Sequence, residues 1–200
     1  MTSEVEERWR CFVAVPIGET LRAELAAAVD ALRARAPADF GELRWTEPEA
    51  WHLTLAFLGP ISPDAVPGLA ASMTEVAVTH PPFAVPTGGL GAFPSRRDVR
   101  VLWYGVTDRS RRLAELAVEV RNAIGLKESA PFRAHLTLAR ARGDRGSPLA
   151  PAIRDAEFPT GVLNVDRLVL FRGHLGSGPP RYEPLAEAAL AAPAPAGGNR

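Results

Sequence analysis

The chain contains the same five residues twice, and this repeat limits what it can fold into. His-Leu-Thr-Leu-Ala occupies residues 52–56 and again residues 135–139. Because side chains alternate between the two faces of a β-strand, each copy would place its His and Thr on one face and its two Leu on the other. We therefore expect two strands that anchor Leu side chains in the core and present an imidazole and a hydroxyl on a polar face.

The segments around the two copies follow one order, which predicts a duplicated unit. The first half is expected to form a strand at 9–16, a helix at 19–35, a strand at 51–58, a helix at 65–79 and an extended region at 82–93. The second half is expected to form a strand at 99–106, a helix at 109–124, a strand at 134–141, a short helix at 148–156 and a strand at 163–171, before a last short strand or helical turn at 181–190. Two such units around a pseudo-twofold axis would bring His52 and His135 face to face across a central cleft.

Length and composition fit one folded domain without a strong bias of charge. The 200 residues are 46% hydrophobic, and 23 basic residues balance 23 acidic ones. This balance argues against a general nucleic-acid coat protein, although it is compatible with a local basic cleft. We expect a single domain over residues 9–190, built as intertwined lobes of about 9–93 and 99–190, with a flexible tail at 1–8 and a disordered tail at 191–200.

The sequence shows neither a secretory leader nor an apolar run long enough to cross a membrane. Cys11 is the single cysteine and lies in the apolar run CFVAVPI, so we expect it in the core and without a disulfide partner in the chain. The expectation is a soluble, cytoplasmic, monomeric protein with no membrane partner.

Paired imidazoles are suited to proton transfer near neutral pH, because the ordinary pKa of histidine is about 6.5. One neutral His can accept a proton while one protonated His donates another. The hydroxyls of Thr54 and Thr137 can hydrogen-bond oxygens of a tetrahedral phosphate that lies between the two rings. In-line displacement at phosphorus needs a base on one side and an acid on the other, and the repeated motif supplies both.

Metal-assisted chemistry is the main rival. A catalytic zinc site usually needs three protein ligands, whereas the motifs supply two His and no adjacent carboxylate or thiolate; His80 and His174 lie in expected loops without ligand spacing. Serine hydrolysis is disfavoured because no GxSxG elbow occurs, and no Walker or Rossmann glycine pattern is present either. We expect no metal and no cofactor. A module that binds nucleotides or RNA ends without turnover remains an alternative.

Several residues beside the motifs are weaker candidates for substrate binding. Arg133 shares the polar face of His135 and Thr137, and Phe132 precedes it. Phe57 is able to stack on a base, but strict alternation places it with the core-facing Leu residues. Either a basic lip for an RNA strand or a solvated loop would account for Arg96, Arg97 and Arg100. Packing in the core or rim is expected for Trp45, Trp51 and Trp103.

These motifs resemble those of the 2H phosphoesterase superfamily, and more narrowly the bacterial RNA 2′,3′-cyclic phosphodiesterases, also called 2′-5′ RNA ligases. The similarity extends over roughly residues 9–186. It is carried, in family order, by the stretches RCFVAVPI, RWTEPEAWHLTLAFLG, GGLGAFP, VRVLWYGV, PFRAHLTLAR, RLVLF and GPPRYEPL. Two positions depart from the family pattern, with Ala134 where Pro is common and Gly173 where Ser is common.

The resemblance implies a bilobal α+β fold, with two antiparallel sheets around a central cleft and helices outside. It also implies metal-independent opening of 2′,3′-cyclic phosphates to 2′-phosphates, on RNA ends or small cyclic nucleotides. In the family's terms His52 is the proton donor, His135 is the proton acceptor, and Thr54 and Thr137 hold phosphate oxygens. The family's phosphate-contacting arginine falls on Arg140, although strict alternation points Arg140 away from His135. The reverse reaction, 2′-5′ ligation, remains a further alternative.

Overall fold

The computed structural model describes residues 7–35, 43–127, 131–143, 153, 156–174 and 180–191. Its strands are β1 (Trp9–Pro16), β2 (Leu43–Trp45), β3 (His52–Ile61), β4 (Phe83–Ser95), β5 (Asp98–Val106), β6 (His135–Ala141), β7 (Gly161–Val165), β8 (Arg167–His174) and β9 (Arg181–Ala189). Its α-helices are α1 (Glu19–Arg35), α2 (Val66–Ala77) and α3 (Arg112–Ala123), with short 3₁₀ turns η2 (Pro48–Ala50) and η3 (Pro63–Ala65). None of the helices in these ranges is both long and apolar enough to cross a bilayer.

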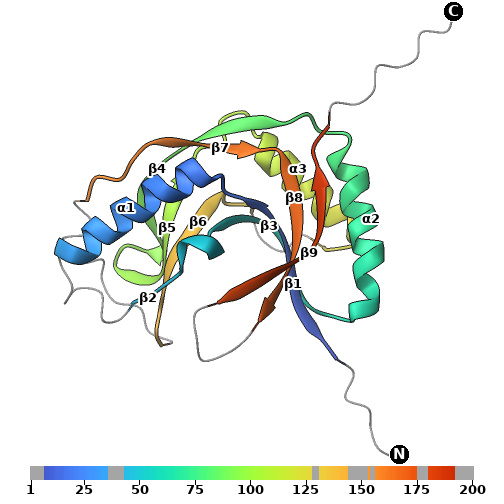
Figure 1. Cartoon of the computed structure of the whole chain (residues 1–200), viewed down its shortest axis with the longest axis horizontal. Helices are drawn as coiled ribbons and strands as arrows, with labels where there is room; N and C mark the ends of the chain where they lie inside the picture. Colours follow the sequence, from blue (N-terminus) through green and yellow to red (C-terminus); the bar gives the residue numbers. More distant parts are fainter. Residues whose placement is uncertain are drawn as a thin grey trace, which may run out of the picture.

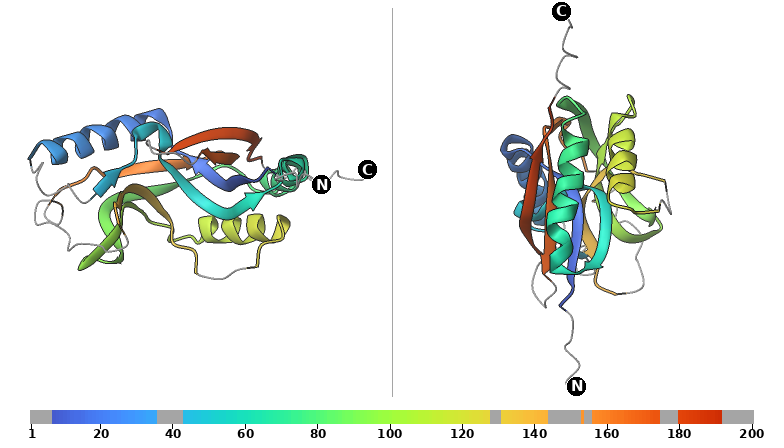
Figure 2. Two further views of the ribbon diagram at one scale, coloured as in Figure 1. Left: turned by 90° about the horizontal axis from the view of Figure 1, so that it is seen from below. Right: turned by 90° about the vertical axis from the view of Figure 1, so that its right-hand side faces the viewer.

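The strands form a curled antiparallel sheet, which confirms the α+β class (Figure 1). The order is β7-β4-β5-β6-β3-β1-β8-β9, and β2 pairs with the outer part of β6. The two expected sheets are joined into one, because β3 and β6 are paired through Leu53 opposite Leu136. Helices α1 and α3 lie on opposite sides of the sheet, and α2 packs beside β9 (Figure 2).

The prediction of a single strand at 163–171 was wrong. The segment 163–171 is two strands, β7 and β8, which separate at Asp166. They lie far apart in the sheet because β7 pairs with β4 in one half and β8 pairs with β1 in the other. The chain therefore crosses between the halves at Asp166, whose carbonyl accepts a hydrogen bond from the Leu190 amide at 2.7 Å. The predicted helix at 148–156 lies outside the described residues, apart from Ile153 and Ala156.

The core confirms the expected burial of the motif leucines. Leu53, Leu55, Leu136 and Leu138 have no exposed surface, and Cys11 is also fully buried. The last segment, left open between a strand and a helical turn, is strand β9. The duplication of the chain stays a prediction.

Each motif strand carries a β-bulge at the same place. In β3 the partners of Ala14 and Val13 are Thr54 and Ala56, so Leu55 is an extra residue. In β6 the partners of Trp103 and Leu102 are Thr137 and Ala139, so Leu138 is the extra one. A bulge shifts the alternation of the side chains that directly follow it by one.

The bulges overturn two expectations that strict alternation had produced. Phe57 was expected on the core side but is 56% exposed. Arg140 was expected to point away from His135, yet it lines one pocket together with His52 and Thr137. Both residues follow the motif Ala directly, so the bulge brings each of them onto the face that carries the His and the Thr.

Two glycines provide a stability test with opposite signs. A Cβ on Gly91 would lie 2.1 Å from the Trp103 ring, whereas a Cβ on Gly68 in α2 would meet nothing within 4 Å. We expect Gly91→Ala to lower the free energy of unfolding by about 1–3 kcal/mol through overpacking. Gly68→Ala should raise it by up to about 1 kcal/mol through helix propensity. Urea denaturation of both variants checks this, and equal effects would contradict the packing at Gly91.

Candidate active site

The two imidazoles are held in the same way. His52 and His135 are the first residues of β3 and β6. The Nδ1 of His52 lies 2.8 Å from the carbonyl oxygen of Ala50, and the Nδ1 of His135 lies 2.7 Å from that of Arg133. A carbonyl oxygen only accepts, so we assign the proton of each neutral ring to Nδ1. Each ring is thus oriented by the backbone two residues earlier, and its Nε2 is available to exchange a proton.

Two adjoining pockets form the cleft between the motif strands. A pocket of about 490 Å³ surrounds His52 and also has Thr137 and Arg140 in its wall. A pocket of about 720 Å³ surrounds His135. Thr54 and Phe57 line both pockets and form their common border.

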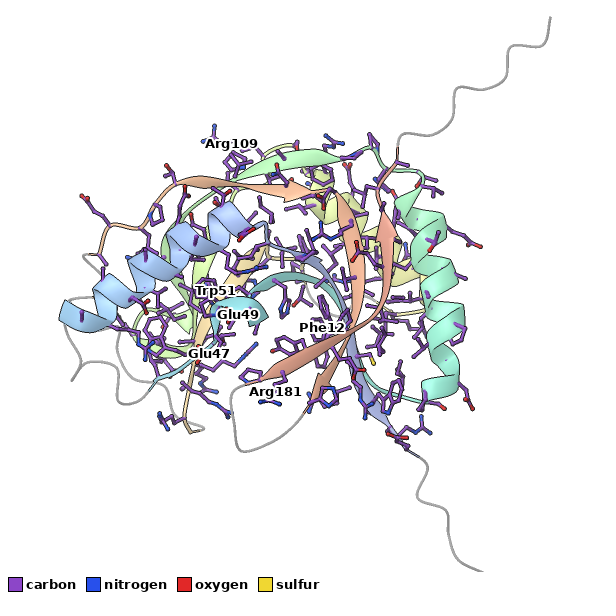
Figure 3. The ribbon with its side chains drawn as sticks, viewed as in Figure 1. Phe12, Glu47, Glu49, Trp51, Arg109 and Arg181 are labelled. Carbon is purple, nitrogen blue, oxygen red and sulfur yellow. The ribbon has the colours of Figure 1, made fainter. Side chains whose placement is uncertain are left out.

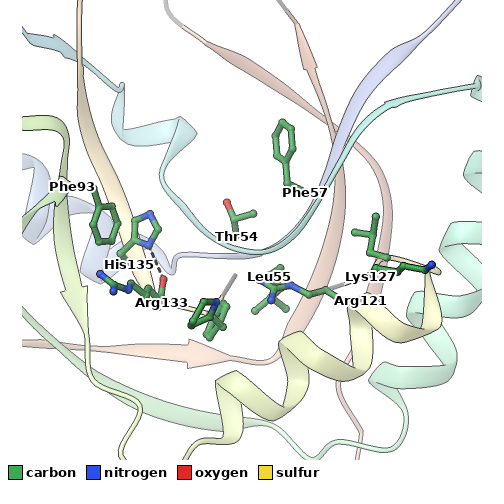
Figure 4. Close-up of a pocket in the computed structure, with 11 residues that line it drawn as sticks. Thr54, Leu55, Phe57, Phe93, Arg121, Lys127, Arg133 and His135 are labelled. Atoms are coloured by element: carbon green, nitrogen blue, oxygen red, sulfur yellow. Dashed lines mark hydrogen bonds between the residues drawn. The ribbon is translucent and has the colours of Figure 1, made fainter. Parts of the chain in front are cut away.

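The structure brings all the predicted site residues to this cleft. Figure 4 shows His135 on one wall of the larger pocket and Phe57 on the other, with Thr54 between them. Phe132 and Arg133 line the same pocket. The arginines at 96, 97 and 100 line neither pocket; Arg96 donates to the Leu90 carbonyl and Arg100 pairs with Asp98.

The surroundings of both rings favour the neutral imidazole. Burial lowers the pKa of His52 to about 4, helped by the positive charges of Arg140 and His135 and opposed by the hydrogen bond to Ala50. Burial and Arg140 also lower the pKa of His135 from its ordinary value. The cleft therefore favours two neutral rings beside a guanidinium, and an anion placed among them would stabilise a protonated ring.

Aromatic side chains desolvate His52, and sequence reasoning did not find them. The Phe12 ring stacks on the imidazole with centroids 4.7 Å apart, and the Tyr182 ring meets it edge-on at 5.0 Å. In Figure 3 Phe12 lies close to where β1 passes β9. Phe12 stands in an apolar run that predicts only a core strand, and Tyr182 stands 130 positions after His52. The alternation of side chains along the first strand was the available signal that Phe12 faces away from its neighbours in the core. No local sequence signal places Tyr182 beside His52.

Of the two remaining histidines, only His174 differs in position from expectation, because His80 lies in a loop as predicted. His174 was predicted in a loop, but it ends β8, bonds Glu183 at 2.8 Å and lines the His52 pocket. His80 follows α2 and bonds Glu119 on α3 at 2.9 Å, away from both pockets. Within the described ranges, no group of three or more His, Cys, Asp or Glu side chains is placed to hold a metal ion.

Comparison with known proteins identifies relatives of this arrangement. The sequence profile of the LigT-like phosphoesterases matches residues 17–103. An RNA 2′,3′-cyclic phosphodiesterase of Aquifex aeolicus is 33% identical over 72% of this chain and 80% of its own length. One of Geobacillus stearothermophilus is 32% identical over 90% of this chain, which spans 57% of that longer protein.

A solved structure shares the fold. The structure of Escherichia coli LigT complexed with 3′-AMP covers 92% of this chain and 99% of its own, with a TM-score of 0.71 and 25% identity. The family profile begins beside β1 and includes the first motif strand, and the alignment to the Aquifex protein covers most of both chains. This protein therefore belongs to the LigT-like phosphoesterase family of the 2H superfamily.

Proposed function

We propose that this protein is an RNA 2′,3′-cyclic phosphodiesterase that opens 2′,3′-cyclic phosphates to 2′-phosphates without a metal ion. The observation that carries the proposal is the matched pair of imidazoles, each fixed through Nδ1 to a backbone carbonyl beside one shared cleft. Support comes from relatives named RNA 2′,3′-cyclic phosphodiesterase and from the nucleotide bound to Escherichia coli LigT.

The proposed reaction is an in-line displacement at phosphorus. His135 accepts a proton through Nε2 from a water molecule while the water oxygen bonds to phosphorus. The bond from phosphorus to O3′ breaks, and protonated His52 donates its Nε2 proton to O3′. The product keeps the phosphate on O2′, and proton exchange with solvent restores the starting charge of each ring. The larger pocket beside His135 provides space for the attacking water.

Thr54, Thr137 and Arg140 would hold the nonbridging oxygens. The Thr hydroxyls share the cleft with the imidazoles, and the guanidinium of Arg140 offers a planar fork that suits a phosphate. Negative charge on these oxygens grows in the transition state, so donors already in place stabilise it more than the ground state. The same anion raises the pKa of the imidazole that must donate.

Product analysis tests the reaction directly. Adenosine 2′,3′-cyclic phosphate incubated with the protein in EDTA should yield the 2′-phosphate alone, resolved from the 3′-phosphate by chromatography or ³¹P NMR. A 3′-phosphate product would show that O2′, and not O3′, is the leaving group, which contradicts the proposed reaction. Loss of activity in the presence of the chelator would refute the metal-independent mechanism. Tight binding without turnover would indicate a binding module instead.

Removing either imidazole should stop turnover. We expect His52→Ala and His135→Ala each to lower kcat by about 10²–10⁴, the usual contribution of a general acid or base. The control is His80→Ala, which removes a histidine paired with Glu119 away from the cleft. Circular dichroism should show all three variants folded. Turnover that survives in either motif variant would contradict the paired mechanism.

The pH dependence should differ between the empty and the occupied enzyme. Burial and Arg140 lower the pKa of both imidazoles in the empty cleft, whereas a bound phosphate anion raises both. The profile of kcat/KM reports the free enzyme and that of kcat the complex, so the optimum of kcat/KM should lie at lower pH than that of kcat. The apparent values belong to the coupled pair. Coinciding optima would show that the anion does not reach both rings.

A further inference from the structure

The His52 pocket holds more positive charge than one cyclic phosphate requires. Arg10, Arg140 and the two histidines His52 and His174 line it, and none of its described lining residues is an Asp or a Glu. His174 is already paired with Glu183. A cyclic phosphodiester carries one negative charge, which Arg140 and a protonated imidazole can balance. Arg10 is left without a role in the reaction at phosphorus.

Arg10 has no anionic partner among the described residues. Its guanidinium carbon lies 5.5 Å from the centroid of the Phe57 ring. The neighbouring carboxylate of Glu7 is engaged elsewhere, since it accepts hydrogen bonds from the Trp9 indole and from Arg172. Arg121 of the cleft differs, because it donates a hydrogen bond to the Leu55 carbonyl. Arg133 lies over the Phe93 ring much as Arg10 lies over Phe57, but it lines the other pocket, beside His135.

Aromatic rings lie between His52, the proposed proton donor, and Arg10. Arg10 and Phe12 lie two residues apart on β1, so they share a face and stand roughly 7 Å apart along the strand. Phe12 stacks on His52, and the Phe57 ring is nearly parallel to Phe12, with 11° between their planes and 6.4 Å between centroids. The exposed Phe57 ring lines the same pocket as Thr54, which is proposed to hold the scissile phosphate. The ring therefore offers a surface for a sugar or base.

The partner of Arg10 on β8 is a glycine that lines the same pocket. Gly173 pairs with Arg10, and a Cβ there would meet the Tyr182 ring at 3.7 Å. A larger residue at this position would fill the pocket between Arg10 and Tyr182.

We propose that Arg10 binds a second phosphate, the one on the 5′ side of the nucleoside that carries the cyclic phosphate. This inference rests on the proposed function. The leaving O3′ faces His52, so the nucleoside attached to it occupies the His52 pocket, and its 5′ side extends along Phe12 and Phe57 toward Arg10. The preferred substrate is then an oligonucleotide end or a 5′-phosphorylated cyclic nucleotide, and not a bare nucleoside cyclic phosphate.

Three substrates isolate the second phosphate: adenosine 2′,3′-cyclic phosphate, its 5′-phosphorylated form, and a dinucleotide that ends in the cyclic phosphate. In the wild-type protein kcat/KM should be about tenfold higher for a substrate with the second phosphate, as expected for one charge-assisted contact. In Arg10→Gln this ratio should fall to about one, and Arg10→Lys should keep part of it. Arg167→Gln, on the same sheet but paired with Asp166 and Glu187, is the matched control and should keep the full ratio.

The outcomes separate this inference from the proposed function. If the wild type hydrolyses none of the three substrates, the proposed function fails and the subsite fails with it. If it hydrolyses all three equally well, or if Arg10→Gln leaves the ratio intact, the function stands and the subsite is overturned. Loss of the ratio in Lys127→Gln, on the His135 side, instead of in Arg10→Gln would also overturn it. If kcat/KM rises for the dinucleotide alone, Arg10 binds an internucleotide phosphate. If it rises for both phosphorylated substrates, Arg10 binds either an internucleotide or a terminal 5′-phosphate.

Discussion

The cleft depends on where the two motif strands meet. Leu53 of β3 pairs with Leu136 of β6, and both side chains are fully buried. These are equivalent positions of the repeated pentapeptide, so the pairing places each His beside the seam between the two halves of the sheet. Burial of four Leu side chains, worth about 1.5–3 kcal/mol each, fixes the two strands from the side opposite to the cleft.

The bulges decide which side chains beside this seam face the cleft. A regular strand would send Arg140 to the core face, where a guanidinium has no partner and its burial costs several kcal/mol. The extra residue in each motif instead places one more side chain on the cleft face, an arginine in β6 and a phenylalanine in β3. The same backbone irregularity therefore brings a guanidinium, the proposed phosphate contact, to the cleft on one strand and an aromatic border on the other. The two motifs are alike in geometry and differ in the chemistry of the residue that follows.

The surroundings of the two imidazoles in the cleft suit an anionic ligand. Two imidazoles with lowered pKa values stand near a guanidinium, and Phe12 and Tyr182 keep water from His52. Protonation of either ring is disfavoured until negative charge arrives, so binding and proton loading are coupled. The asymmetry of the two pockets gives the rings different surroundings, with His52 enclosed by aromatic rings and His135 beside the larger opening.

The sequence by itself determined the strands of the repeat and the burial of their leucines. It did so because alternation and a repeated motif are local properties. It failed at Phe57 and Arg140, where the bulges reverse alternation, and at 163–171, where the chain passes from one half of the sheet to the other. Only the tertiary structure decided that Arg10, Phe12, His174 and Tyr182 surround His52, since strand order brings together residues that lie far apart in the chain.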